Sequence, residues 1–126
     1  MISALFDQSS YLAAKSMLEA TSLRQQAITA NIANVETPGY KRLMVSESFE
    51  SELQRAVSTG DKDSIRTLKG RLTVDSSAVA AGLDGNTVRV EDELLALNQN
   101  FLEHSLEIRL ITGSLMKLRM AITGKS

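Results

Sequence analysis

The sequence contains one histidine, His104, which follows Glu103 and lies three residues before Glu107. Residues three apart share one face of a helix, so His104 and Glu107 could supply two ligands to one metal ion. A metal site needs more ligands than these, and no second pair of this kind occurs in the sequence. We therefore interpret His104 as a packed or interface histidine, and we expect neither a metal nor a cofactor.

Other residues that could support catalysis or ligand binding are equally isolated. Gly82 and Gly85 are not followed by the Gly-Lys-Ser/Thr of a phosphate-binding loop. Ser76 and Ser77 have no histidine near them in the sequence. The chain has no cysteine, which excludes disulfides, thiolate metal sites and cysteine nucleophiles. The sequence therefore predicts neither an enzyme nor a small-molecule substrate.

Length and composition favour one mainly helical domain. The 126 residues are 43% hydrophobic but 4% aromatic, so a core must be built from aliphatic side chains, which suits helix packing. The net charge is -1 and no basic run occurs, which disfavours nucleic acid as a partner. Met1 to Asp7 lacks the features of a cleaved secretory signal, and no apolar run reaches the roughly 18 residues of a membrane span.

The first element that must position these residues is a long helix from about Ser10 to Asn34. This stretch has no glycine or proline, and it carries a three-four seam that includes Leu18 and Ile28. The sequence Thr-Pro-Gly-Tyr at residues 37–40 then predicts a type II turn, with the glycine at the position of positive φ. We expect the helix to end near Asn34, in a left-handed conformation.

Residues 41–87 predict a shorter and less regular connector. Phe49 and Leu53 lie four residues apart on a short amphipathic helix that should end at Gly60. Residues 61–64 are polar and predict an exposed loop.

The rest of the connector predicts a small β element. Residues 72–74 and 88–90 alternate in hydrophobicity as short strands do, so we expect them to pair across the turn signal at residues 84–86. Residues 76–82 predict a loop or linker.

The strongest periodic pattern predicts a C-terminal helix about 45 to 50 Å long, which starts with acidic residues 91–93 and ends at Gly124. Its three-four seam consists of Leu94, Leu97, Phe101, His104, Ile108, Ile111, Leu115, Leu118 and Ile122. Further apolar residues lie off this seam: Leu95, Leu102, Leu106, Leu110, Met116 and Met120. One partner helix cannot cover all of them, so we expect copies of the chain or related subunits to pack here. The alternative, a closed intramolecular bundle, needs a third long helix that the sequence does not show.

One motif resembles a known family. The residues Asn31-Ile32-Ala33-Asn34 and Thr37-Pro38-Gly39-Tyr40-Lys41 are similar to the N-terminal signature of bacterial flagellar rod, hook and related axial proteins. Within the flagellar basal-body rod proteins, the chain looks most like those of the proximal rod, because it lacks a long middle domain. Residues 84–88 and 118–124 also resemble the corresponding parts of proximal rod proteins.

The resemblance implies a structural subunit that assembles helically into the proximal rod, part of the drive shaft and export channel, and that is required for motility. The implied fold is mainly α: an elongated antiparallel coiled coil of the N- and C-terminal helices, with a short, partly irregular middle segment carrying a small β element. Residues 1–126 would form one axial domain, divided into 1–40 (helix and signature turn), 41–87 (connector) and 88–126 (C-terminal helix).

The implied partners are copies of the chain, other rod proteins, and the proteins that join the rod to the MS ring and export gate. The implied location is the periplasmic rod, reached through the flagellar type III system without a cleaved signal. Two alternatives stay open: another short proximal rod or axial component, and a cytoplasmic helical export chaperone or adaptor.

The predicted site residues are structural. The first set forms the signature turn and serves assembly: Asn31, Ile32, Ala33, Asn34, Thr37, Pro38, Gly39 and Tyr40. The second set forms the coiled-coil seam and packs subunits together: Leu18, Ile28, Leu94, Leu97, Phe101, Leu102, Leu106, Ile108, Ile111, Leu115, Leu118 and Ile122. Asparagine is a poor helix former, so we hypothesise that Asn31 or Asn34 binds backbone groups of the turn or of a neighbouring subunit. For Asn34, ordinary helix capping is the alternative.

Overall fold

The computed structural model describes the backbone of residues 8–124 and the side chains of residues 11–117 and 119–124. In chain order its elements are α2 (Gln8–Ala33), β1 (Leu43–Val45), α3 (Glu47–Thr59), α4 (Lys62–Thr67), β2 (Leu72–Val74) and α5 (Val90–Thr123). The fold is mainly α with a two-stranded antiparallel sheet in the middle segment, as predicted. Within residues 8–124, no helix combines the length and apolar character needed to cross a membrane.

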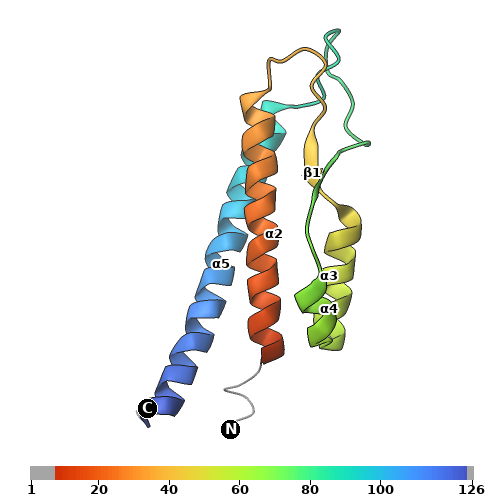
Figure 1. The fold of residues 1–126 in the computed structure, drawn as a ribbon. Coiled ribbons are helices and arrows are strands. Elements are labelled where there is room, and N and C mark those ends of the chain that lie inside the picture. Colours follow the sequence, from red (N-terminus) through yellow and green to blue (C-terminus); the bar gives the residue numbers. More distant parts are fainter. Residues whose placement is uncertain (1–7, 125–126) are drawn as a thin grey trace.

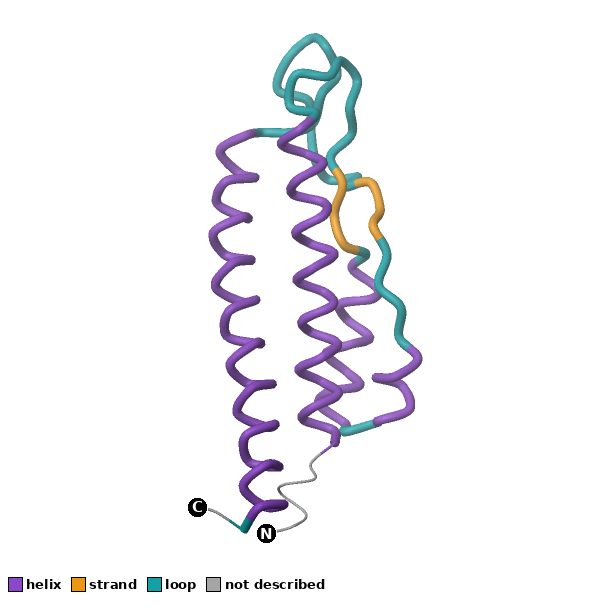
Figure 2. Tube along the Cα trace, turned by 60° about the vertical axis from the view of Figure 1, so that its left-hand side comes forward, coloured by secondary structure: helices purple, strands orange, loops and turns teal. Residues whose placement is uncertain are grey.

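The two long helices lie side by side and run in opposite directions (Figure 1). The 34 residues of α5 span about 51 Å, and the 26 residues of α2 about 39 Å. Figure 2 shows α2 between α5 on one side and the middle segment on the other. As a result, α2 is covered on two sides, whereas α5 has a single long neighbour.

The helix ends follow from local sequence. Gly60 ends α3 with φ 70°, and Gly124 ends α5 with the same φ, a conformation that costs glycine little. Glu91, Asp92 and Glu93 occupy the first turn of α5, where the helix dipole favours carboxylates. These predicted boundaries are confirmed.

A small core joins the middle segment to α2. Ala20 of α2 packs with Val45, Phe49 and Leu53, and partly buried residues surround this cluster: Leu23, Val57, Leu68 and Leu72. Gly70 lies against the same cluster, where an added Cβ would come within 2.3 Å of a methyl group of Leu23. The connector is therefore folded onto α2.

The prediction of a loop at residues 61–64 is wrong, because Asp61 caps α4. Its Oδ1 accepts a hydrogen bond from the Ser64 N–H at 3.2 Å, and its Oδ2 accepts one from the Ser64 hydroxyl at 2.7 Å. Such a cap satisfies a backbone donor at the start of a helix. Ile65 then buries its side chain and fixes the helix in place.

The predicted pairing of residues 72–74 with residues 88–90 is also wrong. β2 pairs with β1, with Leu43 opposite Val74 and Val45 opposite Leu72. Val90 is instead the first residue of α5, since the acidic residues that follow it favour a helix start.

The left-handed conformation expected for Asn34 does not occur. Within residues 8–124, positive φ is confined to glycines. The chain leaves α2 through a further turn, in which the Thr37 N–H donates to the Asn34 carbonyl at 3.0 Å.

Candidate assembly surface and signature junction

The predicted turn at Thr37 to Tyr40 is present. Gly39 has φ 74°, and the Tyr40 N–H donates to the Thr37 carbonyl at 3.2 Å, as in a type II turn. The Gly39 N–H also donates to the Asp84 carbonyl at 2.7 Å, which brings the turn against the loop before α5.

Asn86 holds this loop against the end of α2. Its Nδ2 lies 2.8 Å from the Asn34 carbonyl, 3.1 Å from that of Val35 and 2.8 Å from that of Thr37. These three carbonyls belong to the turn that follows α2, and those of Asn34 and Thr37 also accept backbone N–H groups, so the amide adds to the hydrogen bonds of the turn and pairs with the Val35 carbonyl. This role of Asn86 is not evident from the sequence, in which the residue is only part of a turn signal.

Asn31 connects α2 to the strand that follows the turn. Its side chain is fully buried, at 0% exposure. Its Oδ1 accepts from the Leu43 N–H at 2.8 Å, and its Nδ2 donates to the Leu43 carbonyl at 2.9 Å. The Tyr40 hydroxyl donates to the same Oδ1 at 3.5 Å. These contacts agree with the hypothesis that an asparagine of the signature binds backbone groups.

The other signature residues lie at the surface of the junction. Asn34 is half-buried; its Nδ2 donates to the Ala30 carbonyl at 2.8 Å and its Oδ1 accepts from the Thr37 hydroxyl at 3.1 Å. Ile32 is half-buried, whereas Ala33 and Pro38 are exposed.

A chain of charges extends the junction to the start of α5. Glu93 is fully buried, accepts from Asn31 Nδ2 at 3.3 Å, and pairs with Arg42 Nε at 2.5 Å. The same guanidinium reaches Asp75 at 2.9 Å. Hydrogen bonds from the Ser77 hydroxyl and N–H, together with Arg42, lower the pKa of Asp75 below its usual range. Sequence reasoning missed this network because the residues that pair in it, Asn31 with Glu93 and Arg42 with Glu93 and Asp75, are 33 to 62 residues apart.

The interface between α2 and α5 is polar at its most buried positions. Asn100, 2% exposed, donates to the Thr21 carbonyl at 2.9 Å and to Gln25 Oε1 at 3.3 Å. Its Oδ1 accepts from Arg24 at 3.2 Å. Within residues 8–124, no described side-chain polar atom is both buried and without a hydrogen-bond partner. The contact between the two helices is therefore specified by hydrogen bonds as well as by packing.

His104 lies at this interface. The Thr21 hydroxyl is 3.1 Å from His104 Nδ1, 3.0 Å from Glu107 Oε2 and 2.9 Å from the Leu18 carbonyl. Burial raises the pKa of Glu107, and the neighbouring Glu103 adds to the effect. Within residues 8–124, no group of three or more potential ligands from His, Cys, Asp and Glu could hold a metal ion. These contacts favour the interpretation of His104 as a packed histidine.

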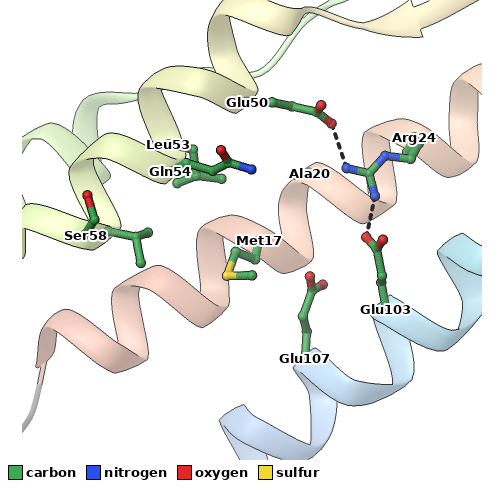
Figure 3. Close-up of a pocket in the computed structure, with 10 residues that line it drawn as sticks. Met17, Ala20, Arg24, Glu50, Leu53, Gln54, Ser58, Glu103 and Glu107 are labelled. Carbon is green, nitrogen blue, oxygen red and sulfur yellow. Dashed lines mark hydrogen bonds and ion pairs between the residues drawn. The ribbon is translucent and has the colours of Figure 1, made fainter.

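A groove of about 460 Å³ lies between α3 and the two long helices (Figure 3). Arg24 crosses one end of it and pairs with Glu50 of α3 at 2.6 Å and with Glu103 of α5 at 2.7 Å. Met17 and Leu53 contribute apolar lining. The ion pairs tie three helices together, and the groove contains no constellation typical of catalysis.

The predicted seam residues divide into two groups. Ile28 is buried, and Leu18, Leu97 and Ile111 are half-buried. Leu118 lies outside the described side chains. The structure places the remaining predicted seam and packing residues of α5 at the surface: Leu94, Phe101, Leu102, Leu106, Ile108, Leu115 and Ile122. They do not contribute to the buried part of the α2 contact.

Together with four neighbours, these exposed residues make up what we call the apolar surface of α5. The four neighbours are Leu95, Leu110, Met116 and Met120. Phe101 and Leu102 are 67% and 68% exposed. Large contiguous apolar surfaces are uncommon on soluble monomers and mark interaction sites.

Comparison with known proteins agrees with these features. The family model for flagella basal body rod proteins matches residues 12–41, which include most of α2 and the signature turn. A flagellar basal body rod protein FlgB from Borreliella burgdorferi is 34% identical over 106 residues, covering 71% of this chain and 77% of that protein. FlgB from Bacillus subtilis is 30% identical over 118 residues, covering 85% of this chain and 88% of the relative. FlgB from Escherichia coli is 30% identical over 108 residues, with 73% and 77% covered.

Proposed function

Because this chain belongs to the family of flagellar basal body rod proteins, we propose that the apolar surface of α5 is where it packs against other subunits of the rod. The protein is a structural subunit of the flagellar basal body rod and not an enzyme. Membership of a rod family implies assembly with other rod components. The finer assignment of which surface does this is our proposal.

The observation that carries the proposal is the exposure of α5 in the isolated subunit. Leu102 and Leu106 are 68% and 58% exposed, and each would gain about 1.5 to 3 kcal/mol from full burial. The middle segment cannot supply that burial, since it packs on the other side of α2 (Figure 2). Contact with further subunits is the arrangement that removes this surface from water.

We propose that the covering subunits are copies of this chain, other rod proteins, and the proteins that join the rod to the MS ring and export gate. An elongated subunit with a long exposed helix suits lateral packing into a tube better than binding a single partner. A cytoplasmic export chaperone or adaptor is the competing assignment; the signature and the FlgB relatives favour the rod.

We propose further that the subunit reaches the periplasmic rod through the flagellar type III system, without a cleaved signal. Residues 1–40, 41–87 and 88–126 would then act as signature helix, connector and packing helix of one axial domain. The contacts of Asn31 and Asn86 support this division, because they join the ends of the two long helices to the connector.

The test replaces an exposed leucine of α5 by a charged residue. Leu102→Glu or Leu106→Glu should leave the isolated chain folded, since both side chains are exposed, but should prevent its incorporation into rods. A strain lacking the gene would be complemented with each variant and assayed for swimming and for the subunit in purified basal bodies. Export is measured separately, as the amount of subunit outside the cytoplasm.

The matched control is Gln99→Glu, which adds the same charge at an exposed polar position of α5. This control should assemble and support motility. Incorporation of Leu102→Glu and Leu106→Glu at the level of the control would show that the packing surface lies elsewhere. Full motility of the strain that lacks the gene would contradict the rod role itself.

A further inference from the structure

Two neighbouring rows of side chains run along α5, one polar and buried against α2, the other apolar and exposed. The polar row consists of Glu93, Asn100 and Glu107, spaced seven residues apart and 0%, 2% and 5% exposed. The apolar row begins one residue later and has the same spacing: Leu94, Phe101, Ile108, Leu115 and Ile122. Every member of the apolar row is exposed.

A rotation of α5 about its own axis by one residue position would exchange these rows. Successive residues of a helix are about 100° apart, so the two rows lie on either side of the half-buried row that contains Leu97, His104 and Ile111. Turning α5 by about 100° about its own axis would replace the polar row with the apolar one and leave the middle row beside the interface. The rotated pair of helices would bury more apolar surface, so the hydrophobic effect alone would favour the rotated arrangement.

The hydrogen bonds of the polar row oppose this rotation. Glu93 binds Asn31, Asn100 binds the Thr21 carbonyl, and Glu107 binds the Thr21 hydroxyl. Rotation would carry these groups away from α2, so that Asn31 and Thr21, 0% and 1% exposed, would lose their bonds to α5, and Glu93, Asn100 and Glu107 would lose their partners on α2. Unpaired buried polar groups are costly, and a buried polar residue at a seam position is known to fix helix register.

We propose that the polar row of α5 determines the rotational setting of α5 on α2 and so keeps the apolar row out of the intramolecular interface. As a result, the subunit buries less apolar surface between α2 and α5, but the rotation of α5 about its axis is fixed. The polar row sets the rotation whether or not the proposed function is correct. The further statement, that the apolar row is thereby available to another rod subunit, rests on the proposed function.

The test measures the rotation directly, using the absence of cysteine from the chain. Single cysteines are introduced as Glu107→Cys in the polar row and Ile108→Cys in the apolar row. The full chain is labelled with a fluorescent maleimide at nanomolar concentration, where contacts between copies cannot protect a thiol. With the bonds of Glu93 and Asn100 to α2 still in place, the thiol at 107 should react at least about tenfold more slowly than the thiol at 108, since a buried thiol reacts only when the structure opens.

Each reporter is then combined with Thr21→Val and Asn100→Ala, which remove hydrogen bonds of the polar row from both helices. The matched control is Thr29→Val with Asn98→Ala, the same substitutions at exposed positions of the same two helices. We expect the order of reactivity to reverse in the first background, with 108 becoming slow and 107 fast, and to stay unchanged in the control.

Two results would overturn the proposal. An unchanged order after Thr21→Val and Asn100→Ala would show that the apolar row does not compete for the interface. Rapid labelling of both thiols would show that the polar row merely holds the helices together. Both readouts come from the isolated chain, so they are independent of whether Leu102→Glu blocks assembly.

Discussion

Replacing Asn31 by alanine should lower the stability of the isolated subunit more than any other single change in the signature. The Asp75 N–H donates to the Arg42 carbonyl and the Ser46 N–H donates to the Arg71 carbonyl. Alternate residues of a strand turn their backbone groups to opposite sides, so Leu43 directs its N–H and carbonyl away from β2. Asn31 satisfies both of these groups.

The expected loss can be worked from these contacts. Leaving a buried donor or acceptor unpaired costs about 1 to 3 kcal/mol, so Asn31→Ala should cost about 2 to 6 kcal/mol. A domain of this size has a free energy of unfolding of about 5 to 15 kcal/mol. If the wild-type value is about 5 kcal/mol, Asn31→Ala should be partly unfolded without denaturant. Urea denaturation of the isolated chain, followed by far-ultraviolet circular dichroism, measures the free energy of unfolding.

Two further variants make the comparison specific. Asn34→Ala removes a half-buried side chain, and it should cost only about 0.5 to 1.5 kcal/mol. Asn31→Asp keeps the acceptor for the Leu43 N–H but places a carboxylate beside Glu93 and the Leu43 carbonyl. Burial and like charge raise the pKa of the introduced carboxyl, so this variant should become more stable as the pH falls, relative to wild type. A loss for Asn31→Ala no larger than that for Asn34→Ala would refute this account of the junction.

Three other predictions concern the same chain and use the same denaturation assay. Burial raises the pKa of Glu107, so its stabilising contribution is complete below the unfolded pKa and is lost as the pH rises through the folded pKa. Glu107→Gln should therefore be at least as stable as wild type at pH 7 and show a smaller loss of stability from acid to neutral pH; a larger loss would contradict this. Asn86→Ala should cost about 1 to 3 kcal/mol, because it takes the amide away from the Val35 carbonyl while the carbonyls of Asn34 and Thr37 keep their backbone donors, and a change below about 0.5 kcal/mol would show that water replaces the amide. Gly39→Ala should cost about 1 to 2 kcal/mol from its positive φ alone, with Gly39→Asn costing less, since no atom lies within 4 Å of an added Cβ; equal losses would point to another cause.

The features that the sequence predicted are those set by local chemistry. The Thr37 to Tyr40 turn follows from the preferences of proline and glycine, and the end of α3 at Gly60 follows from glycine's tolerance of positive φ. The helical pattern of α5 needed only its own periodicity. In each case the determining residues lie within a few positions of the feature that they determine.

The features that the sequence did not predict depend on distant partners. The pattern of α5 shows which side is apolar, but it does not show which side a partner covers. Nothing in the local sequence distinguishes Glu93 and Asn100 from exposed polar residues of a helix, because their partners lie 62 and 79 residues away. The pairing of β2 with β1 was hidden for a similar reason, because three-residue strands carry too little pattern to identify a partner.

We expect the signature and the apolar surface of α5 to serve different requirements, stability of the subunit and assembly, and variants should separate them. The signature acts within the subunit: Asn31 joins α2 to β1 and, through Glu93, to the start of α5. Leu102 has no such role, since its side chain is exposed in the isolated chain. Asn31→Ala should thus lower stability before any assembly takes place, whereas Leu102→Glu should leave stability within about 0.5 kcal/mol of wild type and fail only at incorporation into the rod. A large loss of stability for Leu102→Glu would mean that the apolar surface already packs within the subunit, and the two requirements would then be one.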